Sequence, residues 1–447
     1  MGRQILVTSI PSWNQKTGSD TFSSLFASFD SKTMANIYIV GGSPDSPVCS
    51  RYFHINEMSV VKSVLNPHVQ TGCEVERSKE ETQKEAVYVQ KIKVKRLRVF
   101  LWARELAWKM GCWKSKELTD FLDDFHPDVL VFSIESYPYF NRLNQYIINH
   151  CRPKKVIGYL WDDNFTYKQH SHNLFFLLER FFLRRQVRKL VTSCTDILAI
   201  SPKMKEECDK EFGVNSIVLT KPIFNQGEFK EFIIGSPIRI LYTGKLIIGR
   251  EHTIAKVAAA IREVNKGGQK VVLDVYTQTI LSRKMRQQID IPGCCVLHAP
   301  VPQSEVIRLQ KEADILLFAE SLSCHDLTAR LSFSTKLTDY FAAGKCVWGV
   351  GNADLGPIDY IKSENAGLVS SNDKEISEVL NKIVSSPELV CENAKLGYEC
   401  GVRNHNKDKV MKTLEELIFS PVGGGKILTA NQMRIILGVQ YTMPIAA

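Results

Sequence analysis

The regular alternation of short apolar runs with longer helical stretches constrains the fold of this chain more than any other feature. Residues 5–8, 37–40, 129–132 and 156–160 are apolar runs of strand length, and amphipathic stretches such as 137–149 separate them. Parallel strands need long crossover connections, which are usually helices. The pattern therefore predicts an α/β fold with doubly wound, mainly parallel sheets.

The alternation is interrupted once, between residues 225 and 236, where Gly227 lies in a stretch without a periodic apolar face. A chain of 447 residues is two to three times the usual domain length. We therefore expect an N-terminal domain over residues 1–224, a linker over 225–236, a second domain over 237–419, and a tail over 420–447 to which we assign no role. Two facing domains of this kind would bind a ligand in a cleft at the carboxyl ends of their strands.

Composition excludes several other classes of protein. Hydrophobic residues make up 44% and charged residues 23%, which is typical of a globular chain and not of a disordered or coiled-coil one. The apolar runs are far shorter than the roughly 20 residues that span a bilayer. The start has no secretory h-region, and the 12 cysteines include one close pair, Cys294 and Cys295, whose adjacency disfavours a bridge. These features predict a cytoplasmic protein.

The net charge of +9 is concentrated in two segments. Residues 91–118 carry +7 and residues 175–190 carry +4, so the rest of the chain is slightly acidic. Local basicity of this kind indicates an anionic surface or ligand at one place.

A single helix over residues 97–125 is predicted in the first basic segment. One stripe on a helical wheel is expected to fill the core and contains Val99, Trp102, Ala103, Leu106, Met110 and Trp113. A second stripe on the opposite side, Leu97, Leu101 and Trp108, would face a partner. With residues 175–185, it suits an anionic membrane, which predicts peripheral attachment at the inner face of the cytoplasmic membrane. Two ordinary core helices with solvated basic faces fit the same pattern, and no recognised module supports nucleic acid.

Two cations flank a glycine-containing loop in the second half. A strand over residues 238–242 is followed by Gly244, Lys245 and Arg250. Glycine allows a ligand to approach the backbone closely, and two cations at this spacing suit a diphosphate. Alternatively, both cations are simply exposed to solvent and bind no ligand.

A helix start follows further along, at residues 334–343. Ser334 and Thr335 can cap this helix, whose free N–H groups attract an anion, and Lys336 adds a full charge. Asp339, one turn later, could accept hydrogen bonds from ribose hydroxyls.

Residues 336–347 resemble the K-x-x-E-Y-x-A-x-G-x-P-V signature of GT-B glycosyltransferases, especially the family 4 type (glycosyl transferases group 1). The loop Gly244-Lys245-Leu246 with Arg250 is similar to the G-R-L…K loop of that family. The resemblance implies two facing Rossmann-like domains with an interdomain cleft. It also implies transfer of a hexose-type sugar, with retention, from a nucleotide diphosphate-sugar to a glycan or lipid-linked acceptor in cell-surface polysaccharide biosynthesis.

The resemblance also implies roles for individual residues. Lys245 and Arg250 would contact the donor diphosphate, Lys336 would lie near a phosphate, and Asp339 would hold the ribose. The family often has an earlier glutamate, and Leu331 occupies that position here. Glu320 is the nearest upstream acid that could take its place. This departure keeps an alternative open, a non-catalytic sugar-nucleotide-binding or scaffold subunit of a glycan-assembly complex; an isomerase of the same fold is a weaker option.

We expect neither a metal nor another cofactor, because fixed cations and helix N–H groups can stabilise the departing diphosphate. A base for the acceptor would come from strand ends of the N-terminal domain. The candidates are Glu135, Asp162 and Asp163, each of which could equally be a turn or cap carboxylate.

Overall fold

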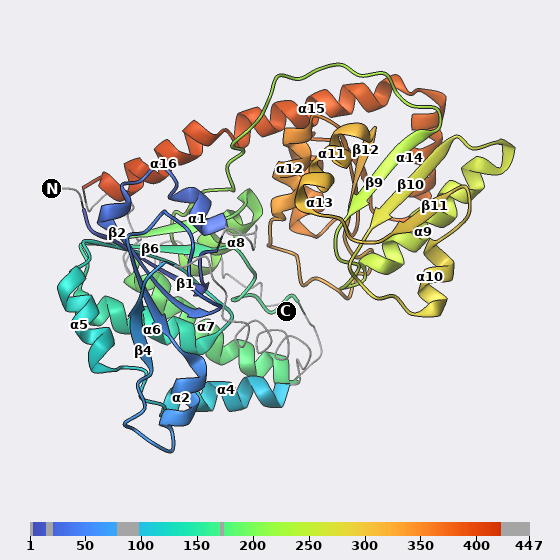
Figure 1. Ribbon diagram of the computed structural model, residues 1–447. Helices are drawn as coiled ribbons and strands as arrows, with labels where there is room; N and C mark the ends of the chain where they lie inside the picture. The colour runs from blue at the N-terminus through green and yellow to red at the C-terminus, as the bar shows by residue number, and fades with distance from the viewer. Residues whose placement is uncertain (1–2, 15–20, 78–97, 170–173, 422–447) are drawn as a thin grey trace, which may run out of the picture. The chain divides into compact units, whose positions relative to one another are not determined.

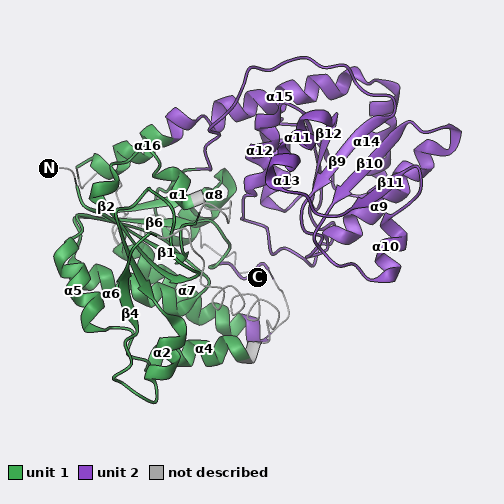
Figure 2. Ribbon diagram, in the orientation of Figure 1, with its two compact units in different colours: residues 1–165, 177–219, 411–447 green, residues 166–176, 220–410 purple. Residues whose placement is uncertain are grey.

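The computed structural model describes residues 3–14, 21–77, 98–169 and 174–421 (Figure 1). The chain divides into two compact units (Figure 2). The first contains Met1–Phe165, Leu177–Leu219 and Met411–Ala447, and the second contains Thr166–Phe176 and Thr220–Val410. Each unit is an α/β Rossmann-like domain built on its own sheet, so the predicted fold class is confirmed.

The first sheet has eight strands in the order β4-β3-β2-β1-β5-β6-β7-β8. All neighbours are parallel except β3 and β4, and Ile5 on β1 pairs with Met34 on one side and Val129 on the other. The strands are β1 (Ile5–Pro11), β2 (Met34–Val40), β3 (Arg51–Ile55), β4 (Gly72–Val75), β5 (Val129–Ser133), β6 (Lys155–Leu160), β7 (Asp196–Ala199) and β8 (Ile217–Val218).

The central strands of this sheet are buried on both faces, which explains their continuous apolar sequences. The helices between them, with the short η2 (Ser31–Thr33), are α1 (Thr21–Leu25), α2 (Glu57–Ser63), α4 (Arg98–Met110), α5 (Lys116–Phe125), α6 (Pro138–Cys151), α7 (Leu174–Ser193) and α8 (Pro202–Phe212).

The second sheet has six strands, all parallel, in the order β11-β10-β9-β12-β13-β14. They are β9 (Ile238–Thr243), β10 (Val271–Tyr276), β11 (Cys295–His298), β12 (Ile315–Ala319), β13 (Cys346–Val350) and β14 (Leu368–Ser370). The order reverses between β9 and β12, so the loops that follow these two strands flank the point where α/β sheets usually bind ligands.

Helices cover both faces of the second sheet. Apolar residues of α9 and α14 join one core cluster, while a Cβ on Gly349 would lie 2.8 Å from Ile361 of α13, on the other face. The helices, with the short η3 (Asn265–Gly267), are α9 (Arg250–Val264), α10 (Arg283–Ile289), α11 (Gln303–Glu312), α12 (Thr335–Ala343), α13 (Gly356–Ser363), α14 (Asp373–Ser385), α15 (Glu388–Asn404) and α16 (Lys407–Phe419).

The domain boundaries differ from those predicted at two places. Phe229, Phe232 and Ile234 of the expected linker pack against the core of the second unit, so this stretch is part of that unit. Residues 411–421 belong to the first unit, where Arg3 donates a hydrogen bond to the carbonyl of Ile418. Residues 422–447 of the tail lie outside the described residues.

The single helix expected over residues 97–125 is two helices, α4 and α5. A Cβ at Gly111, directly after α4, would lie 2.6 Å from the carbonyl oxygen of Val60. Ser115 then begins α5, since its hydroxyl accepts a hydrogen bond from the N–H of Leu118. A glycine in close contact followed by an N-cap residue ends one helix and starts another.

The predicted faces of α4 are wrong in most positions, although Leu101 is exposed and Trp113, just after the helix, is buried as predicted. Trp108 is fully buried and stacks on Tyr139 with ring centroids 4.7 Å apart, whereas Trp102, Leu106 and Met110 are exposed. The orientation is fixed from α2, where Glu57 pairs with Arg104 and accepts a hydrogen bond from Trp108. Leu97 lies outside the described residues.

Candidate functional site

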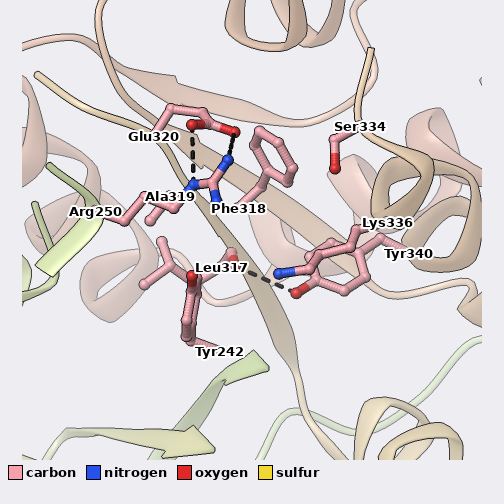
Figure 3. Close-up of a pocket in the computed structure, with 9 residues that line it drawn as sticks. All are labelled: Tyr242, Arg250, Leu317, Phe318, Ala319, Glu320, Ser334, Lys336 and Tyr340. Atoms are coloured by element: carbon pink, nitrogen blue, oxygen red, sulfur yellow. Dashed lines mark hydrogen bonds and ion pairs between the residues drawn. The ribbon is translucent and has the colours of Figure 1, made fainter. Parts of the chain in front are cut away.

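A small cavity of about 60 Å³ lies at the carboxyl ends of β9 and β12 in the second unit (Figure 3). Its volume is enough for several water molecules or a small anion. The side chains around it come from β9, α9, β12 and α12. They are Tyr242, Arg250, Leu317, Phe318, Ala319, Glu320, Ser334, Lys336 and Tyr340.

Gly244 has the close contact that its place after β9 suggested, and the contact is with Lys336. The glycine has a φ of +146°, and a Cβ there would overlap the Nζ atom of Lys336. That Nζ donates a hydrogen bond of 2.9 Å to the carbonyl of Thr243 and lies 5.3 Å from the ring centroid of Tyr242. The missing side chain at 244 thus leaves room for the lysine at the cavity.

Burial, followed by the positive charge of Arg250, lowers the pKa of Lys336 to about 8. Both effects disfavour a second cation in a confined space. An anion in the cavity would relieve both, so the site is suited to negative charge.

Arg250 is held by Glu320. Its Nε and one terminal nitrogen donate hydrogen bonds of 3.0 and 2.8 Å to the two carboxylate oxygens of Glu320, whose side chain is only 4% exposed (Figure 3). A Cβ on Gly351 would lie 2.9 Å from the Cβ of Glu320, so the acid is also confined from behind. Glu320 is therefore a partner of Arg250.

The loop between Gly244 and Arg250 contains a strained residue. Ile248 has a φ of +58°, a conformation that a β-branched residue rarely adopts, and Gly249 follows at +77°. A Cβ on Gly249 would lie 2.5 Å from the hydroxyl oxygen of Ser321. This tight turn starts α9 at Arg250 and directs its guanidinium into the cavity.

Helix α12 begins at the cavity. Ser334 is its N-cap residue, but the Ser334 hydroxyl makes no capping hydrogen bond. The N–H groups of the first turn therefore keep the partial positive charge of a helix N-terminus. Thr335 is the first residue of this helix and is not among the residues that line the cavity.

Besides Gly244 and Thr335, the predicted donor residues Lys245 and Asp339 also lie outside the cavity lining. Lys245 is exposed, although its charge is close enough to lower the pKa of Lys336 as a weaker contribution. Asp339 is 44% exposed and pairs with Lys221 at 3.2 Å. The structure thus brings together Arg250, Glu320, Ser334 and Lys336.

Sequence reasoning missed the two tyrosines of the site. The Tyr242 hydroxyl donates a hydrogen bond of 2.9 Å to the carbonyl of Lys245, and the Tyr340 hydroxyl lies 3.5 Å from the carbonyl of Leu317. Both residues are adjacent to the charged motifs, and the signal that could have indicated them is an aromatic residue beside a glycine loop.

The candidate bases occupy neighbouring strand ends in the first unit. Glu135 follows β5 and is 8% exposed, and Asn141 fixes its backbone through hydrogen bonds of 3.1 and 2.8 Å. Burial raises the pKa of Glu135 to about 7, and the negative charge of Asp162 contributes to the rise. Asp162 is exposed.

Asp163 has a different environment. It is 1% exposed, lies 3.7 Å from Arg180, and accepts a hydrogen bond from Arg180 through its backbone carbonyl. This arrangement is typical of a carboxylate that orders a loop. Within the described ranges, no group of three or more His, Cys, Asp or Glu residues is arranged to hold a metal ion.

Solved structures with the GT-B fold are similar to this chain. HepE from Anabaena, in complex with UDP, has a TM-score of 0.59 at 10% identity, and the match covers 93% of this chain and all of HepE. Sucrose-phosphate synthase from Thermosynechococcus elongatus has a TM-score of 0.58 at 11% identity, covering 93% of this chain and 98% of that one.

TarM matches with a TM-score of 0.51 at 9% identity over 68% of this chain, and the match spans just over half of TarM, at 57%. No protein-family model matches the chain, and no curated protein matches it in sequence. The structural matches show that this chain has the GT-B fold of glycosyltransferases.

Proposed function

We propose that this protein is a glycosyltransferase that moves a sugar from a nucleotide diphosphate-sugar to an acceptor. The observation that supports it most is the cavity at the carboxyl end of the second sheet, where Arg250, Lys336 and the start of α12 meet. Two cations and a helix N-terminus face one carboxylate, which leaves excess positive charge for an anion. In HepE, a protein of the same fold, the bound ligand is UDP.

The diphosphate of the donor would bind in this cavity. Lys336 and Arg250 would contact its oxygens, and the free N–H groups of α12 would face a phosphate. Glu320 holds the Arg250 guanidinium in place before the donor arrives. These groups stabilise the departing diphosphate more strongly as its negative charge develops, which is the condition for accelerating transfer. This chemistry requires no metal.

Glu135 and Asp162 would act on the acceptor side. A carboxyl group with a pKa of about 7 is poised to gain or lose a proton near neutral pH. We propose Glu135 as the residue that exchanges a proton with the acceptor hydroxyl, and Asp162 as the charge that tunes it. Asp163 would contribute by ordering the loop that carries Asp162, because Arg180 pairs with it.

The finer assignments extend the same proposal. The sugar is of the hexose type, transferred with retention, and the acceptor is a glycan or a lipid-linked glycan of a cell-surface polysaccharide. We place the protein in the cytoplasm, peripheral at the inner face of the cytoplasmic membrane. None of the helices in the described part of the chain is long and apolar enough to cross a membrane.

A non-catalytic sugar-nucleotide-binding or scaffold subunit is the second candidate. Leu331 is fully buried, so the position of the usual first carboxylate holds an apolar core residue. Asp339, at the second, is paired with Lys221. A protein that binds a donor without orienting its sugar would have these features.

Release of sugar from UDP-, GDP- and ADP-sugars, with and without lipid-linked acceptors, separates the two candidates. The transferase proposal expects slow donor hydrolysis and faster transfer, both insensitive to a chelator. Tight donor binding without turnover under any condition would favour the scaffold, and failure to bind any nucleotide would exclude both.

A further inference from the structure

The outer face of α4 is apolar. Phe100, Leu101, Trp102, Leu106 and Met110 are between 47% and 61% exposed. A helix on the surface of a globular protein normally presents polar side chains to water. Trp108 is buried on the side of α4 opposite Trp102, Leu106 and Met110, while Leu101, on the Trp108 side near the start of the helix, is exposed.

Helix α7 continues the same surface. Leu178, Phe181 and Phe182 are 57%, 43% and 59% exposed. The Nε1 of Trp102 on α4 donates a hydrogen bond of 2.6 Å to Glu179 on α7, so the two helices lie side by side, as they do in Figure 1. We call the eight apolar residues of the two helices the α4–α7 surface. Contiguous apolar patches of this kind mark interaction sites.

The exposed charges on these helices all have one sign. Within residues 100–110 and 174–193, the exposed ionisable residues are Lys109, Arg185, Arg188 and Lys189. Arg185 lies over the ring of Phe181, at 4.4 Å from its centroid. The two acids of the helices are half-buried: Glu105 pairs with Arg142, and Glu179 accepts a hydrogen bond from Trp102. Of the exposed cations, Arg188 pairs with Glu211.

We propose that the α4–α7 surface docks on an anionic lipid bilayer. Aromatic and aliphatic side chains can enter the boundary between headgroups and acyl chains, while long basic side chains reach the anionic headgroups above them. Negative charge and an apolar interior within one side-chain length of each other are the combination that a bilayer offers. The inference rests on the proposed function in one respect: the docked membrane would present the lipid-linked acceptor.

Sedimentation of the full chain with vesicles tests the surface. We expect binding to vesicles of phosphatidylcholine and phosphatidylglycerol in equal parts, much weaker binding to phosphatidylcholine alone, and partial release by salt, which screens charges over ~10 Å at 0.1 M. No nucleotide sugar is added, so the result is independent of donor binding and turnover.

Two variants separate the apolar from the charged contribution. Phe181→Ser with Phe182→Ser should weaken binding about tenfold or more on both vesicle types. Lys109→Gln, Arg185→Gln and Lys189→Gln together should weaken binding to anionic vesicles and remove the salt dependence. Ile307→Ser, a 47% exposed residue on α11, and Arg262→Gln on α9 are matched controls that should bind as wild type does.

Thermal unfolding shows whether each variant is folded. If the double phenylalanine variant does not fold, Leu101→Ser is the milder variant that replaces it. The proposal would be overturned if both variants bound vesicles as strongly as the wild type does. So would a wild-type dimer that ignores vesicles and becomes monomeric in the phenylalanine variant, because the surface would then join two copies of the chain. If the protein binds vesicles but no nucleotide, the proposed membrane-docking role of the α4–α7 surface is supported and the proposed glycosyltransferase function is excluded.

Discussion

Burial makes the positive charge of Lys336 costly to maintain. The residue lies in a cavity beside another cation, and its amine is 2.9 Å from the carbonyl of Thr243. The sequence indicated its neighbourhood because a glycine after a strand and a lysine in the first turn of a helix are local signals. Local signals could not show that Glu320 pairs with Arg250 or that Lys221 pairs with Asp339, because each partner comes from a distant part of the chain.

The affinity for a nucleoside diphosphate should depend on pH through Lys336. Its pKa in the free protein is about 8, and a bound dianion favours the protonated amine and raises that pKa. Affinity should therefore be greatest below pH 8 and fall by up to about tenfold per unit above it. Calorimetry in two buffers of different ionisation enthalpy should show proton uptake on binding above pH 8. Lys336→Arg should lose this dependence, and the same dependence in that variant would exclude Lys336 as its source.

Gly244→Ala should disrupt the cavity. The new Cβ would overlap the amine of Lys336 and would impose a positive φ on a non-glycine residue, which costs about 1–3 kcal/mol. Gly268→Ala is the matched control, because Gly268 also has a positive φ, +126°, but nothing lies within 4 Å of its Cβ position. Gly244→Ala should lower the free energy of unfolding in urea and the affinity for a diphosphate more than Gly268→Ala does. Equal effects would mean that the contact with Lys336 is unimportant.

Glu135→Gln should reduce transfer by about 10²-fold or more and leave donor affinity unchanged, if Glu135 exchanges the proton. In the wild type the rate should rise with pH through about 7, as the buried acid loses its proton. Asp162→Asn removes a negative charge that raises this pKa, so the rise should move to lower pH. A normal transfer rate in Glu135→Gln would exclude Glu135 as the residue that exchanges a proton with the acceptor.

At the scale of elements, the strands were predicted better than the helices of the first unit. Buried parallel strands such as β5 are short, mostly apolar runs that the sequence pattern identifies. The stretch over residues 97–125 misled the prediction, because its apolar spacing continues across Gly111 and Ser115. Which face of α4 is buried depends on Glu57 of α2, and a helical wheel contains no such information.

The break between α4 and α5 should be sensitive to Ser115. Its hydroxyl accepts the N–H of Leu118 at 3.3 Å, and loss of an N-cap hydroxyl typically costs ~1 kcal/mol. Ser115→Ala should lower the free energy of unfolding of the first unit by about this amount, as measured by urea denaturation. Ser115→Asp keeps an acceptor and should restore most of it. No difference between the two variants would mean that the cap contributes nothing.

At the scale of the whole molecule, the sequence predicted two units in this order along the chain. It did not predict which segments belong to each unit. Residues 411–421 join the first unit through contacts with Arg3 and Lys155, which lie more than 250 positions away. No sequence pattern announces such long-range contacts. The structural matches show the GT-B fold, and the proposed activity depends on diphosphate binding in the cavity.

The most direct test of diphosphate binding in the cavity compares wild type with the double variant Arg250→Ala and Lys336→Ala. The quantity measured is the affinity for whichever of UDP, GDP and ADP the wild type binds best. Each lost charged hydrogen bond costs about 1.5–3 kcal/mol, so the double variant should bind the diphosphate at least about 100-fold more weakly. The nucleoside without phosphates should bind weakly and almost equally to both proteins. Arg262→Ala with Lys266→Ala, which removes two exposed cations elsewhere in the second unit, should change neither affinity. Equal affinity of wild type and the double variant for the diphosphate would contradict the assignment of this cavity and the glycosyltransferase proposed from it.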